Sequence, residues 1–254
     1  MLDKSLANPE VAVADVRNGA SIAVGGFGLS GNPTELINAV LDSGVEDLHV
    51  VSNNCGVDGQ GLGVLLAAHR IRKITASYVG ENKEFERQFL SGELEVELTP
   101  QHTGREAAGR RRGHPGVLHP HRGRDPGGRR RAAPTLRRAR RGAQGQPAEG
   151  SAHHRLCRTR GAVRAGTLHR HRLCLVHAAL GDTHGNLIFN KAAQQFSVPA
   201  AMAGRICVAQ VERLVQPGEL DPAQVHLPGV FVHRIVEVGE QHLKPIERRT
   251  TRAK

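Results

Sequence analysis

The chain has 254 residues and a formal net charge of +11, and only 3% of its residues are aromatic. This length suffices for one large domain or two small ones around a buried core. No run approaches 18 apolar residues, so the sequence predicts no membrane-spanning segment. Its four cysteines lie far apart, with no CxxC pair and no secretory leader, which favours a reducing, cytoplasmic setting over a disulfide framework.

The positive charge is concentrated in one segment. Residues 101–172 contain 19 Arg, no Lys and three acidic residues, so this segment carries +16 and the rest of the chain −5. A nucleic-acid arm would explain such charge through phosphate contacts. The segment lacks aromatic side chains for base stacking, and we therefore expect no nucleic-acid partner. His153, His154 and Cys157 have a spacing that Zn²⁺ could use, but no fourth ligand is evident, so we predict no metal site.

Helices and strands alternate over the first hundred residues. The pattern predicts helices at 8–17, 32–44, 61–70 and 82–92, and strands at 20–26, 47–52, 72–80 and 95–99. Asn8 and Asn32 are the expected caps of the first two helices, because each precedes a proline suited to the first turn. Such alternation is typical of βαβ units and a parallel sheet.

The pattern returns after the basic segment. Runs rich in branched residues predict strands at 173–180, 186–190, 205–211 and 230–238, with a turn-rich connector at 216–229. Residues 242–254 form a charged tail. We therefore predict an α/β fold with a largely parallel sheet.

The stretch "VGGFGLSGNP", Val24–Pro33, is the sharpest functional signal. Its glycines allow a tight turn that approaches a ligand closely, and the helix that follows directs free N–H groups into the loop. A plain strand-to-helix turn is the structural alternative. Gly26, Gly28 and Gly31 also satisfy the dinucleotide fingerprint G-x-G-x-x-G, but Asn53 and Asn54 stand where that fingerprint needs an acid. An NAD-type or non-catalytic nucleotide-binding domain is therefore the alternative function.

Several motifs in one order resemble a known family. "NGASIAVGGFGLSGNP" resembles the signature of family I CoA transferases, with Ser30 and Asn32 where many relatives have Cys and Ile. "VSNNCGVDGQGLGVLL", "SYVGENKEFERQFLSGELEVELTPQ", "HAALGDTHGNLIFNKAA" and "GELDPAQVHLPGVFVHR" resemble the A subunits of succinyl-CoA:3-ketoacid CoA transferases. The resemblance covers residues 1–101 and 173 to about 250.

The resemblance implies a three-layer α/β fold and a transferase. Residues 1–101 and 173–241 would be the two halves of one CoA-transferase A domain. The enzyme would move CoA from succinyl-CoA to a 3-oxo acid such as acetoacetate, through an intermediate on a glutamate. That glutamate is expected in a Ser-Glu-Asn-Gly motif of a B subunit, and this chain lacks the motif. We thus expect no catalytic residue in this chain, a heterodimer or heterotetramer, and no cofactor beyond CoA as substrate.

The same resemblance implies which residues touch the substrates. Amides near the reacting carbonyl would stabilise developing charge, although an Asn after a strand also commonly caps a turn. Glu81 and Asn82 of "VGEN" are candidates for the active-site cleft. The expected CoA- and substrate-binding residues are Gly25, Gly26, Phe27, Gly28, Leu29, Ser30, Gly31, Asn53, Asn54 and Gln101.

The basic segment departs from the family and suggests a shifted reading frame. When GC-rich codons for His114–Gly127 are read one base later, they spell Ile-Pro-Ala-Phe-Tyr-Thr-Pro-Thr-Gly-Val-Gly-Thr-Gln, which resembles the family sequence at this place. Residues 102–173 also lack Lys, Ile, Asn, Met and aromatic residues. We expect a frameshifted translation that returns to frame near Cys174. As written, residues 102–172 have too little apolar content for a core and are expected to be disordered, which makes activity of this chain doubtful.

Overall fold

The computed structural model describes residues 3–99 and 171–242. Gln101, most of the basic segment and the tail beyond 242 lie outside the described residues. The first ten described elements in chain order are α1 (Pro9–Val13), β1 (Ser21–Val24), α2 (Thr34–Asp42), β2 (Leu48–Val51), α3 (Gly63–Ala67), β3 (Ile71–Ala76), α4 (Lys83–Ser91), β4 (Glu95–Leu98), β5 (His171–Asp182) and β6 (Leu187–Ile188). The remaining ones are η3 (Lys191–Ala193), α6 (Gln194–Ala203), β7 (Gly204–Val215), η4 (Pro222–Gln224), η5 (Gly229–Phe231), β8 (Arg234–Glu237) and η6 (Glu240–His242).

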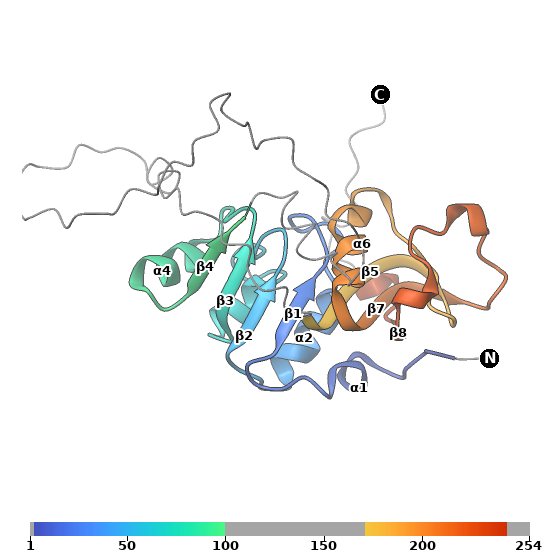
Figure 1. The fold of residues 1–254 in the computed structure, drawn as a ribbon, viewed down its shortest axis with the longest axis horizontal. Helices are drawn as coiled ribbons and strands as arrows, with labels where there is room; N and C mark the ends of the chain where they lie inside the picture. Colours follow the sequence, from blue (N-terminus) through green and yellow to red (C-terminus); the bar gives the residue numbers. More distant parts are fainter. Residues whose placement is uncertain (1–2, 100–170, 243–254) are drawn as a thin grey trace, which may run out of the picture. The chain divides into compact units, whose positions relative to one another are not determined.

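One eight-stranded sheet organises the described residues (Figure 1). Its order is β4-β3-β2-β1-β5-β7-β8, with β6 added antiparallel to β5 and every other pair parallel. The chain builds outward from β1 to β4 and then from β5 to β8. The order therefore reverses between β1 and β5, and the crevice at the carboxyl ends of those two strands is where open α/β sheets bind ligands.

Two apolar clusters cover the two faces of the sheet, as the predicted three-layer fold requires. On one face, Ile22 and Val24 of β1 pack with α1 to α4, for example against Leu36 and Phe85. On the other face, Ala23 of β1 packs in the cluster that contains Phe196 of α6. Alternate residues of β1 thus serve opposite clusters, as the pleat of a strand dictates.

The helices and strands predicted for residues 8–99 are all present, although the first helix is shorter than predicted and ends at Val13. The second half differs more. Helix α6 was not predicted, because Pro199 interrupts a sequence that otherwise lacks a helical period. The predicted strand 230–238 divides into the 3-10 helix η5 and the strand β8.

The start of β5 contradicts one predicted boundary. His171 and Arg172 were assigned to the disordered segment, but both belong to β5, and His171 is buried and pairs with Gly204. The prediction was wrong by two residues at this end. The reason is that β5 runs between β1 and β7, so its first residues gain backbone partners that composition does not reveal.

Candidate functional site

Three loops meet at the carboxyl edge of the sheet, because β1, β2 and β3 are parallel neighbours. They are the glycine loop Gly25–Gly31, the segment that begins with Ser52, and the segment Ser77–Asn82. Hydrogen bonds join them: Ser52 Oγ donates to the carbonyl of Val24 (2.9 Å), and the Ser77 N–H donates to the carbonyl of Asn53 (3.0 Å). This edge is the candidate site.

The glycine loop is a tight turn held by its own backbone. Phe27 and Ser30 exchange two N–H···O bonds of 2.9 and 3.0 Å, and Phe27 to Ser30 is here called the first glycine turn. Gly26, Gly28 and Gly31 have φ of 108°, 61° and 68°, a region that favours glycine. Gly25 and Gly31 pack closely on α6 and η3, since a Cβ on Gly25 would lie 2.7 Å from Ser197 Oγ and one on Gly31 would lie 2.7 Å from the Cα of Ala193.

A second turn of similar form follows β2. Val57 and Gln60 exchange backbone N–H···O bonds of 3.4 and 3.1 Å, with Gly59 at φ 73°, and Val57 to Gln60 is here called the second glycine turn. Sequence reasoning missed its place in the site. The glycine-rich run "CGVDGQGLG" directly after a strand was the signal that could have found it.

The two predicted asparagines have different surroundings. Asn53 is 5% exposed and its amide is engaged on both sides: Oδ1 accepts from the N–H of Gly28 (3.4 Å), and Nδ2 donates to Ser77 Oγ (3.1 Å). It therefore joins the loops after β1 and β3. Asn54 accepts from the N–H of Gly56 (3.4 Å) through Oδ1, and no described residue accepts from its Nδ2. Of the two, Asn54 has the side-chain N–H better placed for a ligand.

The residues of "VGEN" lie in the third loop. Asn82 is 2% exposed, caps α4 by accepting from the N–H of Phe85 (2.9 Å), and donates to the carbonyl of Cys55 (3.1 Å). Glu81, the residue before this cap, is exposed. The structure thus gives Asn82 an architectural role at the edge, whereas Glu81 faces solvent.

Asn32 was predicted to cap α2, and that prediction was wrong. The residue that precedes α2 is Pro33, which makes no side-chain cap. The side chain of Asn32 turns back instead, and its Nδ2 donates to the carbonyl of Gly28 (3.2 Å). The competing partner is a half-buried carbonyl of the loop, which the local capping rule does not consider.

Cys55 lies beneath the same edge and is fully buried. Burial raises the pKa of its thiol, since the thiolate would lose its hydration. The protonated thiol packs as a small apolar group and does not act as a nucleophile.

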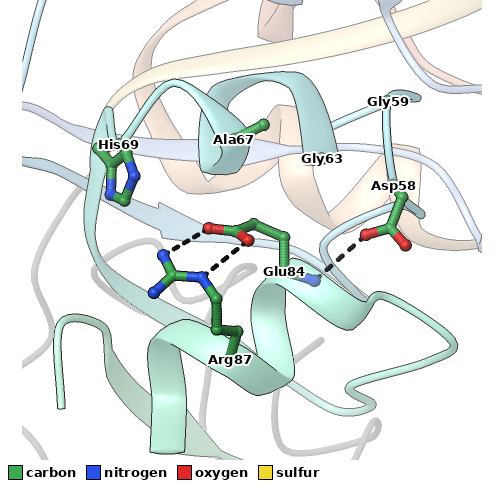
Figure 2. A pocket seen from close by; sticks show the side chains of 7 residues that line it. All are labelled: Asp58, Gly59, Gly63, Ala67, His69, Glu84 and Arg87. Carbon is green, nitrogen blue, oxygen red and sulfur yellow. Dashed lines mark hydrogen bonds and ion pairs between the residues drawn. The ribbon is translucent and has the colours of Figure 1, made fainter. Parts of the chain in front are cut away.

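A cavity of about 440 Å³ lies between α3 and α4, beside Asp58 and Gly59 of the second glycine turn (Figure 2). Arg87 forms a two-bonded ion pair with Glu84 (2.7 and 3.0 Å) and a second pair with Glu93. The guanidinium of Arg87 lowers the pKa of Glu84 to about 2. Asp58 Oδ1 accepts from the backbone N–H of Glu84 (3.2 Å). Because these charges already satisfy one another, we assign this cavity no role in the chemistry.

Within residues 3–99 and 171–242, no helix is both long and apolar enough to cross a membrane. No acid follows β2 in the run Ser52–Gly56, which leaves the dinucleotide fingerprint without its ribose-binding residue.

Known proteins resemble the chain over nearly its whole length. The sequence profile of the family described as "Coenzyme A transferase" matches residues 6–118 and 169–238. The A subunit of a probable succinyl-CoA:3-ketoacid coenzyme A transferase from Mycobacterium tuberculosis (strain ATCC 25618 / H37Rv) is 51% identical over 254 residues, 99% of this chain and 100% of that protein. A protein of the same description from Bacillus subtilis (strain 168) is 44% identical over 98% of this chain and 95% of its own length.

Solved structures share the fold at low sequence identity. Glutaconate coenzyme A-transferase from Acidaminococcus fermentans aligns with a TM-score of 0.62 and 18% identity, covering 93% of this chain and 76% of that chain. An acyl-CoA transferase from Escherichia coli O157:H7 aligns with a TM-score of 0.63 and 18% identity, covering 93% of this chain and 47% of the longer one.

Proposed function

The chain belongs to the coenzyme A transferase family, and we propose that within it this chain is the A subunit of a heteromeric succinyl-CoA:3-ketoacid CoA transferase. The reaction moves CoA from succinyl-CoA to a 3-oxo acid such as acetoacetate. The observation that carries this proposal is the end-to-end identity with A subunits of that description. The glycine loop lies where the strand order of the sheet reverses, and this position supports the proposal independently of how the relatives are described.

The chemistry divides between two chains. A glutamate carboxylate, supplied by the B subunit, attacks the thioester carbonyl of succinyl-CoA, which forms a mixed anhydride and releases the CoA thiolate. The thiolate then attacks the glutamyl carbonyl, giving a glutamyl-CoA thioester and free succinate. The acceptor carboxylate reverses the two steps and leaves as its CoA thioester. Splitting the transfer in this way replaces one difficult step with easier ones.

This chain would supply the groups that stabilise the developing oxyanion. The first glycine turn presents the backbone N–H of Leu29 at the carboxyl edge, and α2, which follows directly, adds the positive end of its dipole. The Nδ2 of Asn54 is a further donor at the same edge. Gly25, Leu29 and Ser30 shape the loop, and the exposed Phe27 begins the first glycine turn. Gln101 would belong to this edge from outside the described residues.

The proposed enzyme needs the B subunit for activity, in a heterodimer or heterotetramer, and CoA only as a substrate. We place it in the cytoplasm, a setting consistent with three buried free thiols, Cys55, Cys174 and Cys207.

We further propose that residues 102–173 are a frameshifted translation, so the chain as written would be inactive. Of this segment, the family profile matches residues 102–118 and 169–173 and leaves out residues 119–168. In this interpretation, the restored reading frame supplies the family's own sequence between β4 and β5.

The test combines purified B subunit with the chain in two versions, as written and with the frame of residues 102–173 restored. We expect the restored version to transfer CoA from succinyl-CoA to acetoacetate only when B is present, and the chain as written to transfer none. The M. tuberculosis relative, combined with the B subunit of its own enzyme, is the positive control. If that control works and the restored version transfers no CoA with its own B subunit, the proposed function is wrong. Binding of NAD without any need for B would favour the alternative.

A further inference from the structure

Asn32 lies at the junction of the two glycine turns. It is 7% exposed, and its Nδ2 donates to the carbonyl of Gly28 (3.2 Å). A Cβ on Gly26 would overlap its Oδ1, and a Cβ on Gly61, just after the second glycine turn, would lie 2.6 Å from its Nδ2. Two glycines from two different loops therefore leave room for one amide.

The hydrogen bond from Asn32 acts on the central peptide of the first glycine turn. That peptide joins Gly28 to Leu29, and Gly28 has a φ of 61° while Leu29 is not among the positive-φ residues. This is the pattern of a type II′ turn, with glycine at the first central position. The central peptide of such a turn is not fixed by the turn's own bonds, which run between Phe27 and Ser30.

Fixing the Gly28 carbonyl also fixes the N–H of Leu29. The carbonyl and the N–H of one trans peptide point in opposite directions. Because the carbonyl faces the buried amide of Asn32, the N–H of Leu29 faces away from it. No described residue accepts a hydrogen bond from this N–H. On the other side, the N–H of Gly28 donates to Asn53 Oδ1 (3.4 Å), so amides hold this glycine at both ends.

We propose that Asn32 is a positioning residue that aims the N–H of Leu29 at the thioester carbonyl of the bound acyl-CoA. The role rests on the proposed function, but the geometry does not depend on it. Without Asn32, the Gly28–Leu29 peptide can rotate and turn its carbonyl toward the substrate, which would repel the developing oxyanion. The Cβ of Leu29 makes this rotation of the peptide unfavourable, and the hydrogen bond from the Asn32 amide makes it more unfavourable still.

Two substitutions test the role, with a matched asparagine in the helix that follows as the control. Asn32→Ala removes the donor, and Asn32→Asp keeps the shape but places an acceptor against the Gly28 carbonyl. Asn38→Ala, in the middle of α2 and only half-buried, is the control. The first measurement is hydrogen exchange of the full chain alone. We expect the N–H groups of Phe27 and Ser30 to exchange about tenfold faster in both Asn32 variants, as the loss of one hydrogen bond predicts. The N–H of His49, which bonds Ala20 in the sheet, should not change.

The second measurement is CoA transfer by the frame-restored chain with B subunit. We expect kcat to fall about tenfold in both Asn32 variants with KM nearly unchanged, because the Leu29 donor acts in the transition state. Asn38→Ala should keep both constants. Unchanged exchange at Ser30, or an unchanged kcat in both variants, overturns the proposal. If the unsubstituted frame-restored chain and its B subunit transfer no CoA, the proposed function is wrong, and so is the role of the Leu29 N–H as a donor to the substrate. Faster hydrogen exchange in the Asn32 variants would then still support Asn32 as the residue that orders the turn.

Discussion

Alanine at Gly26 and at Gly28 should separate two constraints on the glycine loop. Both residues have positive φ, 108° at Gly26 and 61° at Gly28. They differ in surroundings: a Cβ on Gly26 would overlap the amide oxygen of Asn32 and lie 3.3 Å from the carbonyl oxygen of Ser30, whereas a Cβ on Gly28 would meet no atom within 4 Å. Gly26 is constrained by its neighbours, and Gly28 only by its backbone conformation.

The stability losses follow from those two situations. At Gly28, left-handed backbone costs an L-residue about 1–2 kcal/mol, and the stiffer unfolded chain returns about 0.4–1 kcal/mol. We expect Gly28→Ala to lower the free energy of unfolding by about 1 kcal/mol. At Gly26, backbone strain of about 1–3 kcal/mol adds to overpacking of about 1–3 kcal/mol, so Gly26→Ala should cost about 3–4 kcal/mol.

The loss of activity in the alanine variants should not be proportional to their loss of stability. The open space beside Gly28 is where the substrate would approach, so a methyl group there should lower CoA transfer by about tenfold or more in the frame-restored enzyme, about 1.4 kcal/mol of transition-state stabilisation. Gly26→Ala should lose activity as well, through the displaced Asn32. Gly44→Ala is the control, since Gly44 has a φ of 72°, meets nothing within 4 Å and lies at the far end of α2. It should lose about 1 kcal/mol of stability and no activity.

The assays are urea unfolding of each variant and CoA transfer from succinyl-CoA to acetoacetate with B subunit. Equal losses of stability at Gly26 and Gly28 would show that the amide of Asn32 does not constrain Gly26. Full activity of Gly28→Ala would refute the placement of the substrate beside the first glycine turn.

Three further predictions concern other parts of the chain. The DNA should carry two compensating frame changes, near codons 102 and 174, and native peptides that span residues 102–173 in the present frame would contradict this. The Arg234 guanidinium, bonded to both carboxylate oxygens of Asp15 at 2.7 and 3.0 Å, lowers the pKa of that carboxyl. The contribution of this ion pair to the free energy of unfolding is present above the ordinary pKa of an aspartate and is lost as the pH falls through the depressed value. Asp15→Asn should therefore lower the free energy of unfolding by about 1 kcal/mol at neutral pH, a value that partial exposure of the pair keeps small. Urea unfolding at a series of pH values would refute this if the difference persisted in strong acid. Burial raises the pKa of Cys207 to about 12 and that of Cys55 further, so both should resist alkylation at pH 8 until the chain unfolds, as peptide mass spectrometry would show.

Local patterns were enough to predict the first half of the sheet. Asn8 accepts from the N–H of Val11 (2.9 Å), and Gly92 ends α4 in the left-handed conformation, both as capping rules require. These features depend on residues within one turn of each other. For that reason the alternation of strands and helices over residues 8–99 could be predicted without knowledge of the tertiary structure.

The site needed tertiary contacts that no local rule contains. Asn32 satisfies the same capping pattern as Asn8, but it bonds Gly28 because the loop after β1 folds back over it. Asn53 and Asn82 were identified as site residues, yet only the structure distinguishes their bonded amides from the Nδ2 of Asn54, from which no described residue accepts. The glycine loop itself was found because four glycines between a strand and a helix are a strong local signal.

The pairing of β5 with β1 determines where the glycine loop lies. The N–H of Gly25 donates to the carbonyl of Leu175 (2.8 Å), and Ile22 pairs with Leu173, so the loop leaves the sheet directly beside β5. These ladder bonds are made by backbone groups and do not depend on which side chains the first residues of β5 carry. A frame change near Cys174 would replace the side chains at the start of β5, but it would leave the partners of Gly25 in place. We therefore expect the chain as written and the restored chain to share the carboxyl edge, so that a difference in their activity would arise from residues 102–173.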